Sequence, residues 1–469
     1  MNIFHLLCLI YFIFKKKGLY CQLALHRKPK TKQDKRKKNK VKEVKVGIIG
    51  FGTVGAGVAA NILKNGETIA KRTGVKLTLT KIADLDITTD RGVTVPATTL
   101  TTNTTELINE VDVVVELVGG TTIAKDFILQ ALKKGKPCVT ANKALIAEHG
   151  EEIFAAAAES KADVYYEASV AGGIPVVKAL REGLVSNRIK RIYGIMNGTC
   201  NYILTRMERE GLDFETILKD AQDLGYAEAE PSLDVDGFDT AHKASILAAL
   251  AYGEWFGMDP IYVEGIREIS LMDIKFADEL GYRIKLLAII KEVNNDVQIR
   301  VHPTLVSKNT MLANISDVFN GVMIDGDTVG ETLFYGRGAG RDATASAVVA
   351  DLVDVALNLK HDAAERVAAF RPGSHFNELM PMDNVESRYY LRLQVKDEAG
   401  VVAQISDILS KQDVSISSFI QHEEHSEDTV PLLILTHKSK EKQIKAAIAD
   451  FEKLSVVSGK VKLIRIEDI

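Results

Sequence analysis

The segment from Tyr226 to Lys243 has the residue types that acid–base chemistry requires. It reads YAEAEPSLDVDGFDTAHK and carries carboxylates at Glu228, Glu230, Asp234, Asp236 and Asp239. Such a cluster suits a substrate with an ammonium group, and a lysine suits proton exchange with an alcohol or carbonyl oxygen. Asp239 and Lys243 are four residues apart, so on a helix the carboxylate can orient the ammonium. A divalent-metal site, which no His-rich spacing supports, and a plain surface salt bridge are the alternatives.

A second lysine, Lys143, follows the string PCVTAN. Cys138 to Thr140 has the pattern of a short buried strand, so Lys143 is expected just past the carboxyl end of that strand. Ligands of open α/β sheets bind at this edge. Lys143 is therefore a candidate for the same chemistry, with a solvated surface charge as the alternative.

A glycine-rich loop follows the first apolar run of the folded part. Val44 to Ile49 has the pattern of a strand buried on both faces, and it leads directly into GFGTVG. Gly50 permits a tight turn, Gly52 lets the backbone approach a pyrophosphate, and Gly55 lets helix and strand pack closely. This context predicts a dinucleotide-binding loop, with a ligand-free glycine turn as the alternative.

The end of the next strand bears on the choice of dinucleotide. Asp84, in the string KIADLD, is the candidate for binding the adenine ribose hydroxyls. Ala83 precedes it where an arginine would favour NADP, so the sequence favours NAD over NADP. Lys81 and Arg91 remain able to meet a 2′-phosphate.

Alternating strands and helices must position these residues. The pattern predicts an α/β protein with a Rossmann-type, doubly wound parallel sheet over residues 44–165, completed by a helix near 340–360. The sequence pattern of residues 166–336 predicts a second, α+β domain for catalysis and dimerisation. The pattern of residues 371–387 predicts a linker. Residues 388–469 follow a β-α-β-β-α-β order, which predicts a small ferredoxin-like module.

Composition excludes several classes of protein. The 469-residue chain has four Cys and no CxxC pair, so disulfide scaffolds and zinc ribbons are excluded. Residues 1–43 hold 13 Lys and Arg against 2 Asp and Glu, which leaves an acidic remainder that is a poor partner for nucleic acid. We expect this basic extension to be disordered. We expect a cytoplasmic location, with organellar or membrane-surface targeting as the alternative.

Taken together, these strings resemble the homoserine dehydrogenase family. The resemblance runs in order from Val44 to Leu357 through VGIIGFGTVG, VDVVVELVGG, TANKALIA, YEASVAGGIP, MNGTCNYIL, the acidic segment and GRGAGRDATASAVVADL. Residues 389–469 are separately similar to an ACT domain, an amino-acid-sensing module. The resemblance implies reversible, NAD- or NADP-dependent reduction of L-aspartate 4-semialdehyde to L-homoserine, a step toward threonine, methionine and isoleucine.

The resemblance also implies roles for particular residues. Lys243 matches the acid–base lysine, with Asp239 beside it, and Lys143 is implied near both nicotinamide and substrate. Glu228 is implied to bind the substrate ammonium, and Asp234 matches a further substrate-contacting acid. Dinucleotide contacts are implied at Phe51, Thr53, Val54 and Gly340.

The resemblance further implies a monovalent cation, typically sodium. Its ligands would be Glu167 and the backbone carbonyls of Val170, Gly172 and Ile174. One carboxylate in a glycine-containing loop offers oxygen ligands but too little charge for a tight calcium site. We expect a structural role for this cation.

The C-terminal module is expected to regulate the enzyme. Its turn VKDEAGVVAQ, with Asp397, Gly400 and Val401, resembles the place where ACT domains bind an amino acid, and threonine is the expected effector. A plain dimerisation module is the alternative. Because such small sheets pair edge to edge, we expect a homodimer or homotetramer in either case.

Two other functions compete with this interpretation. A Cys-dependent semialdehyde dehydrogenase needs a nucleophilic thiol with a nearby base, and Cys200 is the one tempting candidate, without a His close in sequence. A non-catalytic regulator responsive to dinucleotide and amino acid predicts damage to Lys243 or the acidic segment, and both are intact.

Overall fold

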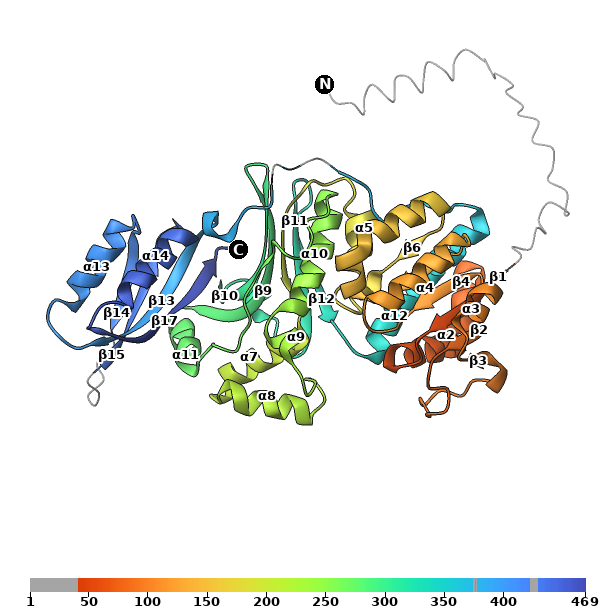
Figure 1. Cartoon of the computed structure of the whole chain (residues 1–469), viewed down its shortest axis with the longest axis horizontal. Helices are drawn as coiled ribbons and strands as arrows, with labels where there is room; N and C mark the ends of the chain where they lie inside the picture. The colour runs from red at the N-terminus through yellow and green to blue at the C-terminus, as the bar shows by residue number, and fades with distance from the viewer. Residues whose placement is uncertain (1–40, 374–375, 377, 422–428) are drawn as a thin grey trace, which may run out of the picture. The chain divides into compact units, whose positions relative to one another are not determined.

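The computed structural model describes residues 41–373, 376, 378–421 and 429–469 (Figure 1). Most of the predicted extension, residues 1–40, lies outside this part of the chain. Lys42 and Glu43 already belong to the first strand, since they pair with Val75 and Lys76, so the folded chain begins slightly earlier than predicted. Within the described residues, no helix is both long and apolar enough to cross a membrane.

The first domain is a six-stranded parallel sheet in the order β3-β2-β1-β4-β5-β6. Its strands are β1 (Lys42–Ile49), β2 (Val75–Ala83), β3 (Leu100–Thr101), β4 (Val113–Glu116), β5 (Cys138–Thr140) and β6 (Val164–Tyr165). Its helices are α2 (Thr53–Thr73), the short η2 (Ala97–Thr99), α3 (Thr104–Glu110), α4 (Thr122–Lys133) and α5 (Lys143–Ser160). The strand order reverses between β1 and β4, which creates the crevice where such sheets bind dinucleotides. The predicted Rossmann-type fold is confirmed.

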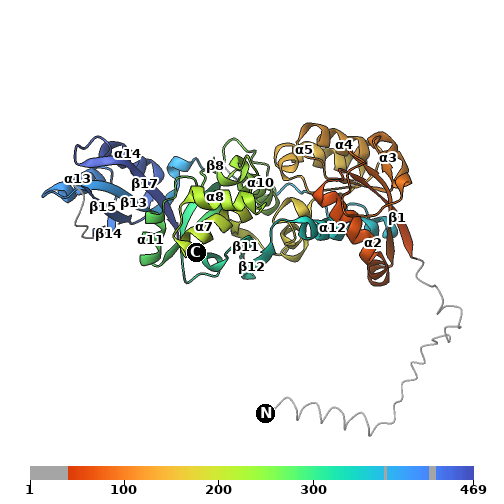
Figure 2. The same ribbon diagram turned by 90° about the horizontal axis from the view of Figure 1, so that it is seen from below.

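A helix from much later in the chain packs onto this domain. α12 (Arg341–His361) lies beside α2, as both views show (Figure 1 and Figure 2). Val348 and Leu352 of α12 are buried in the same apolar core as Ile48 of β1. The chain therefore returns to the first domain after passing through the second.

The second domain is built on antiparallel strands in the order β12-β11-β7-β9-β10. Its strands are β7 (Ile189–Ile195), β8 (Tyr262–Val263), β9 (Tyr282–Val293), β10 (Asp296–Ser307), β11 (Phe319–Gly326) and β12 (Gly330–Arg337). Its helices are α7 (Gly198–Glu210), α8 (Phe214–Asp223), α9 (Ser232–Val235), α10 (Phe238–Tyr252) and α11 (Leu271–Glu279), with short turns η3 (Glu167–Ser169), α6 (Val176–Lys178), η4 (Ala179–Gly183) and η5 (Leu312–Asn314). α10 packs on these strands and also on α5 of the first domain. This contact brings the acidic segment to the dinucleotide-binding sheet.

The C-terminal module has strands in the ferredoxin-like order β17-β13-β15-β14. Its elements are η6 (Met382–Asn384), β13 (Glu386–Lys396), α13 (Val401–Lys411), β14 (Ile416–Gln421), β15 (Thr429–Thr436), β16 (Ser439–Lys440), α14 (Glu441–Phe451) and β17 (Val457–Glu467). Residues 465–467 of β17 pair in parallel with residues 304–306 of β10. The module is therefore joined to the second domain as one continuous sheet, a link that its sequence did not predict.

Buried charges stabilise this seam between β10 and β17. The Glu467 carboxylate accepts hydrogen bonds from Tyr193 (2.9 Å), Lys291 (2.7 Å) and Arg300 (2.7 Å). Glu467 is 6% exposed and Arg300 is 1% exposed, so these charges are withdrawn from water and depend on each other. The module is thus fixed to the second domain by electrostatics as well as by backbone pairing.

The segment predicted as a linker, residues 371–387, contains regular contacts. Leu379 forms a parallel bridge with Val297 of β10, and the backbone N–H of Met380 donates to the Val297 carbonyl at 2.8 Å. β13 begins at Glu386, inside the predicted linker. The segment thus runs along the second domain before it enters the C-terminal module.

Candidate active site

The glycine loop after β1 has the backbone conformation that a dinucleotide requires. Gly50 has φ +98°, and a Cβ on Gly55 would lie 2.0 Å from the Gly50 carbonyl oxygen, so a side chain at position 55 would prevent α2 from starting so close to β1. Gly52 is the N-cap of α2, and a Cβ there would meet nothing within 4 Å. The open backbone at Gly52 and the N-terminal end of α2 therefore fit a pyrophosphate.

Asp84 lies directly after β2, beside this loop. Its Oδ2 accepts a hydrogen bond from the backbone N–H of Phe51, and its Oδ1 accepts one from that of Asp86 at 2.9 Å. These bonds tie the glycine loop to the end of β2. Each carboxylate oxygen has a second lone pair, so Asp84 also fits the ribose hydroxyls of a dinucleotide.

Two lysines from different domains bind one carboxylate. Nζ of Lys243 lies 2.6 Å from Oδ2 of Asp239, one turn earlier on α10. Nζ of Lys143, the first residue of α5, lies 3.1 Å from Oδ1 of Asp239. Lys243 also donates to the carbonyl oxygen of Met196 at 2.7 Å. The contact predicted from the four-residue spacing is present, and the packing of α10 on α5 adds the second lysine.

The side-chain amide of Asn197 joins the two aspartates. Its Nδ2 donates to Oδ1 of Asp234 at 2.7 Å and to Oδ2 of Asp239 at 2.9 Å. Burial opposes ionisation of Asp239, but Lys243 and Lys143 outweigh it and hold the pKa of Asp239 below its ordinary value. Burial and the charge of Asp239 raise the pKa of Asp234. Asp239 is thus a fixed anion, whereas a cationic ligand would stabilise the charge of Asp234.

A cavity of about 630 Å³ is lined by all of the predicted catalytic and substrate-binding residues. The predicted residues in its lining are Val54, Lys143, Gly172, Glu228, Asp234, Asp239, Lys243 and Gly340. Those outside its lining are Gly50, Phe51, Gly52, Thr53, Gly55, Asp84, Glu167, Val170 and Ile174. Glu228 is exposed and Lys243 is buried, so the cavity connects solvent to the buried lysine.

The residues assigned to a cation by resemblance lie in the segment 167–174, which is buried except at Gly173, and Gly172 lines the cavity. Glu167 is 4% exposed, and its two carboxylate oxygens accept backbone hydrogen bonds from Val177 (2.9 Å) and Lys178 (2.7 Å). Burial raises the pKa of Glu167 to about 7. In the part of the chain that the structure describes, no three His, Cys, Asp or Glu side chains form a metal-binding group. A cation here would therefore depend mainly on the backbone carbonyls of residues 170–174.

Sequence reasoning missed two asparagines that position the site. Asn142 and Asn197 are the N-cap residues of α5 and α7, and their side-chain oxygens accept from the third backbone N–H that follows each of them. The Asn142 amide also donates to the carbonyl of Gly120 at 2.7 Å. Each asparagine stands between a strand and a helix, where this residue type is favoured, so capping preference was the available signal.

A buried glutamate, Glu116, was also missed. At the end of β4, its carboxylate accepts from the Thr140 hydroxyl (2.6 Å) and from the backbone N–H of Val118 (2.6 Å). The Thr140 oxygen in turn accepts from the backbone N–H of Asn142 at 3.0 Å. Burial raises the pKa of Glu116 to about 7. This chain of bonds holds the turn that presents Lys143, and no sequence pattern distinguishes it from an ordinary strand end.

Cys200 does not have the environment of a nucleophile. It is fully buried, its Sγ donates to the Asp234 carbonyl at 3.2 Å, and burial raises the pKa of its thiol. A reactive cysteine needs a lowered pKa and access to its substrate. The structure therefore disfavours the Cys-dependent alternative.

A parallel sheet with a phosphate-binding glycine loop, facing a cavity that contains a lysine–carboxylate–lysine group, defines an NAD(P)-dependent oxidoreductase. The comparisons with known proteins identify which one. Family models match residues 50–167 (homoserine dehydrogenase, NAD binding domain), 175–353 (homoserine dehydrogenase) and 389–456 (ACT domain).

Individual relatives agree with these models. The chain is 47% identical to a homoserine dehydrogenase of Pseudomonas aeruginosa and 46% identical to one of Neisseria gonorrhoeae, in each case over 88% of this chain and 96% of the relative. A solved homoserine dehydrogenase from Thiobacillus denitrificans superposes with a TM-score of 0.86 at 44% identity, covering 91% of this chain and 99% of that one. The chain belongs to the homoserine dehydrogenase family, as the sequence motifs predicted. It is an oxidoreductase that acts on a CH–OH group and carries an ACT domain.

Proposed function

We propose that Lys243 is the acid–base residue in the reversible reduction of L-aspartate 4-semialdehyde to L-homoserine. The observation that supports this role is the contact of Lys243 and Lys143 with one buried carboxylate in the cavity. A dinucleotide held at the glycine loop would supply hydride to the substrate carbon, or accept it in the reverse direction. Lys243 gives a proton to the carbonyl oxygen during reduction and takes it back during oxidation, while Lys143 adds positive potential near the same oxygen.

Glu228 and Asp234 are proposed to bind the substrate ammonium. Both line the cavity, and Asp234 is held by Asn197 and by the Thr199 hydroxyl at 3.4 Å. Two carboxylates on the ammonium side would orient the aldehyde toward Lys243, so that reaction occurs from one pose. Asp239 is proposed to hold Lys243 in place.

The first experiment is nicotinamide absorbance during L-homoserine oxidation by the purified chain. We expect turnover in the parent chain and a loss of at least ~100-fold in Lys243→Ala, with dinucleotide binding unchanged. Turnover that persists in Lys243→Ala would overturn this role. Turnover in neither protein would contradict the reaction itself.

NAD is proposed as the preferred dinucleotide. Asp84 lies beside the glycine loop, Ala83 precedes it, and a carboxylate there repels a 2′-phosphate. One similar structure differs from this proposal in its dinucleotide. It is a hyperthermophilic archaeal homoserine dehydrogenase in complex with NADPH, with 30% identity and a TM-score of 0.57. The ratio of kcat/KM for NAD to that for NADP tests the proposal, and a ratio below one would overturn it.

A sodium ion is proposed at Glu167 and the carbonyls of Val170, Gly172 and Ile174. The donor set fits a monovalent cation, because it has one buried carboxylate and otherwise neutral oxygens. Sodium chloride should raise the thermal midpoint more than choline chloride in the parent chain. The two salts should act alike on Glu167→Gln, and a sodium effect that survives this substitution would exclude Glu167 as a ligand.

Threonine is proposed as an effector bound at the ACT-domain turn. Gly400 has φ +93° and is the N-cap of α13, which allows a tight turn after the exposed Asp397. Asp397→Ala should weaken threonine inhibition and leave the basal kcat unchanged. Asp407→Ala, on the exposed side of the same helix, is the matched control. If threonine inhibits Asp397→Ala as strongly as it inhibits Asp407→Ala, the result would favour a plain dimerisation module over an effector site.

Pairing of the outer β14 edges is proposed to form a homodimer or homotetramer. β14 is the terminal strand of the described sheet, so one of its edges is open for such pairing. Light scattering of the purified chain tests the oligomeric state. The predicted cytoplasmic location stays a prediction, which fractionation of cells would test.

A further inference from the structure

Residues 315–319, which are the loop after η5 and the first residue of β11, contribute to the cavity wall. Val318 of this loop and Asn320, the residue after it, line the cavity. A Cβ on Gly198, the first residue of α7, would lie 2.9 Å from the Val318 carbonyl oxygen. The loop therefore lies directly against the start of α7, next to the residues that hold Asp234 and Asp239.

One face of α7 binds this loop through its backbone. The Asn201 amide donates to the carbonyl oxygens of Ile315 (3.2 Å), Asp317 (3.0 Å) and Phe319 (3.1 Å). One turn later, the Thr205 hydroxyl accepts from the backbone N–H of Asp317 at 3.1 Å. Asn201 is itself one turn after Asn197, so the same helix face serves both the aspartates and the loop.

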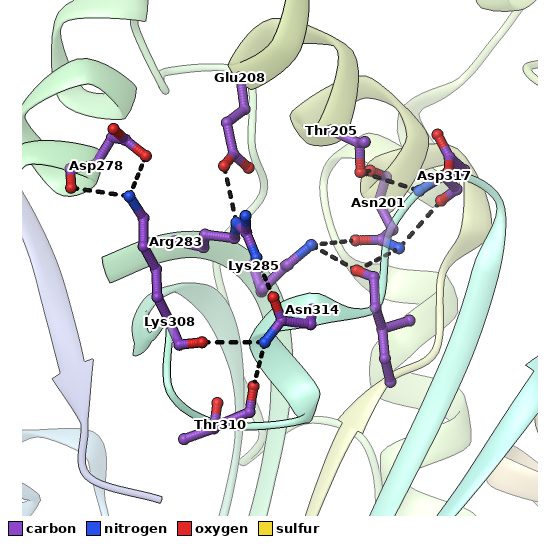
Figure 3. Close-up of polar contacts among 11 residues, drawn as sticks. Asn201, Thr205, Glu208, Asp278, Arg283, Lys285, Lys308, Thr310, Asn314 and Asp317 are labelled. Carbon is purple, nitrogen blue, oxygen red and sulfur yellow. Dashed lines mark hydrogen bonds and ion pairs between the residues drawn. The ribbon is translucent and has the colours of Figure 1, made fainter. Parts of the chain in front are cut away.

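A buried lysine, Lys285, also binds this loop, and we call Asn201, Thr205 and Lys285 together the anchor of the loop. Nζ of Lys285 on β9 donates to Oδ1 of Asn201 (3.0 Å) and to the carbonyl oxygen of Ile315 (2.6 Å), as Figure 3 shows for Asn201. Lys285 is 1% exposed, and among the described residues no carboxylate forms an ion pair with it. Arg283, two residues earlier, pairs with Glu208 at 2.8 Å. Lys285 thus depends on the loop and Asn201 for its hydrogen bonds.

Asn320, which follows this loop on β11 and lines the cavity, has an unpaired acceptor in its side chain. Asn320 is 1% exposed, and its Oδ1 is buried with no hydrogen-bond partner in the described part of the chain. Its amide is pressed against the turn before α12, since a Cβ on Gly338 would lie 1.9 Å from its Nδ2. Leaving a buried acceptor without a donor is unfavourable, and a ligand N–H or O–H would offset this cost.

We propose that Asn320 is a ligand-binding residue of this enzyme and that Lys285 and Asn201 are its positioning residues. The Asn320 oxygen accepts a hydrogen bond from an N–H or O–H donor of the dinucleotide or of the substrate. Lys285 and Asn201 hold the preceding loop and so fix the position of Asn320 in the cavity wall. The inference rests on the dehydrogenase reaction proposed above for the choice of ligands.

The test of the acceptor is Asn320→Leu, which keeps the size but removes the oxygen. We measure KM and equilibrium binding for L-homoserine, and equilibrium binding for NADH and NADPH, so that binding is scored even without turnover. A loss of about tenfold for L-homoserine alone identifies the substrate as donor, and a loss for a dinucleotide alone identifies the dinucleotide. Asn320→Asp, which keeps an oxygen, should restore part of the loss. Changes below twofold for every ligand would overturn the proposal.

The test of the anchor is Lys285→Met, which keeps the aliphatic stem and removes the ammonium. The same ligand should lose about tenfold, with kcat changed less than KM. In the Asn320→Leu background, Lys285→Met should add nothing, because both act through one hydrogen bond. An additional loss in the double variant would show that Lys285 acts independently of Asn320.

Lys308→Met is the matched control for the anchor. Lys308 lies in the turn directly after β10, the strand adjacent to β9, and its ammonium binds Asp278 rather than residues 315–319 (Figure 3). We expect ligand binding by this variant to remain within twofold of the parent chain. A loss equal to that of Lys285→Met would contradict a specific role for Lys285.

Discussion

Lys143 and Lys243 are bound to opposite oxygens of a single carboxylate, that of Asp239, at 3.1 Å and 2.6 Å. Lys143 begins a helix of the dinucleotide-binding domain, and Lys243 lies on a helix of the second domain. Their shared partner therefore aligns the two domains at the point where their chemistry must meet. Asp239 and Lys243 are buried and Lys143 is half-buried, so this charged cluster is sensitive to the loss of any one of its members.

Asp239→Asn should reduce kcat by about 100-fold or more, because neither lysine would keep its fixed anion. Dinucleotide binding should change by less than twofold, since Asp239 is separate from the glycine loop. Steady-state kinetics and equilibrium NADH binding measure the two effects. Asp236→Asn is the control from the same acidic segment, where Asp236 pairs with Arg267 at the surface. An equal loss of kcat in both variants would contradict a special role for Asp239.

Gly55→Ala should abolish dinucleotide binding and destabilise the first domain. The added methyl group would lie 2.0 Å from the Gly50 carbonyl oxygen, so α2 would have to move away from β1. Gly66→Ala in the same helix meets nothing within 4 Å and should stabilise the chain by about 1 kcal/mol. NADH titration and thermal unfolding measure both variants. Normal NADH affinity in Gly55→Ala would contradict the proposed approach of the pyrophosphate.

Glu116→Gln should change how stability depends on pH. Burial raises the pKa of Glu116 from 4.5 to about 7, so between these values the folded state holds a proton that the unfolded state releases. The wild-type contribution to stability is therefore present below pH 4.5 and falls by about 3 kcal/mol as pH rises through 7. The glutamine variant should lose this dependence and gain stability relative to the parent at pH 8.

The measurement for Glu116 is the thermal midpoint of the parent and the variant at several values between pH 5 and pH 8. Glu151→Gln, on the exposed surface of α5, is the matched control, and its difference from the parent should stay constant. A constant difference for Glu116→Gln as well would show that Glu116 ionises with an ordinary pKa.

Glu467→Gln should loosen the seam between β10 and β17. Lys291 and Arg300 would keep their charges without a buried anion, and breaking such a pair costs about 3–5 kcal/mol. Backbone amides of residues 465–467 should exchange hydrogen faster, while those of β1 and β4 should not change. Asp468→Asn removes a surface pair with Arg388 and should have an effect of about 1 kcal/mol or less. Unchanged exchange in β17 would contradict a stabilising role for Glu467.

Much of this protein was predictable from local sequence. The strand–glycine loop–helix string at residues 44–64 determined a dinucleotide-binding fold, because Gly50 adopts a positive φ and Gly55 leaves no room for a side chain. The four-residue spacing of Asp239 and Lys243 likewise predicted their contact, since helix geometry alone brings such side chains together. The family resemblance rested on these strings.

Only the tertiary structure decided what depends on distant segments. Three such features join residues from separate elements. They are the ion pair of Lys143 with Asp239, the hydrogen bond of Thr140 to Glu116, and the buried contacts of Lys285. Sequence periodicity describes one element at a time, so it carries no information about such contacts. The pairing of β17 with β10 was hidden for the same reason, because strand edges are chosen by packing and by buried charge rather than by a local pattern.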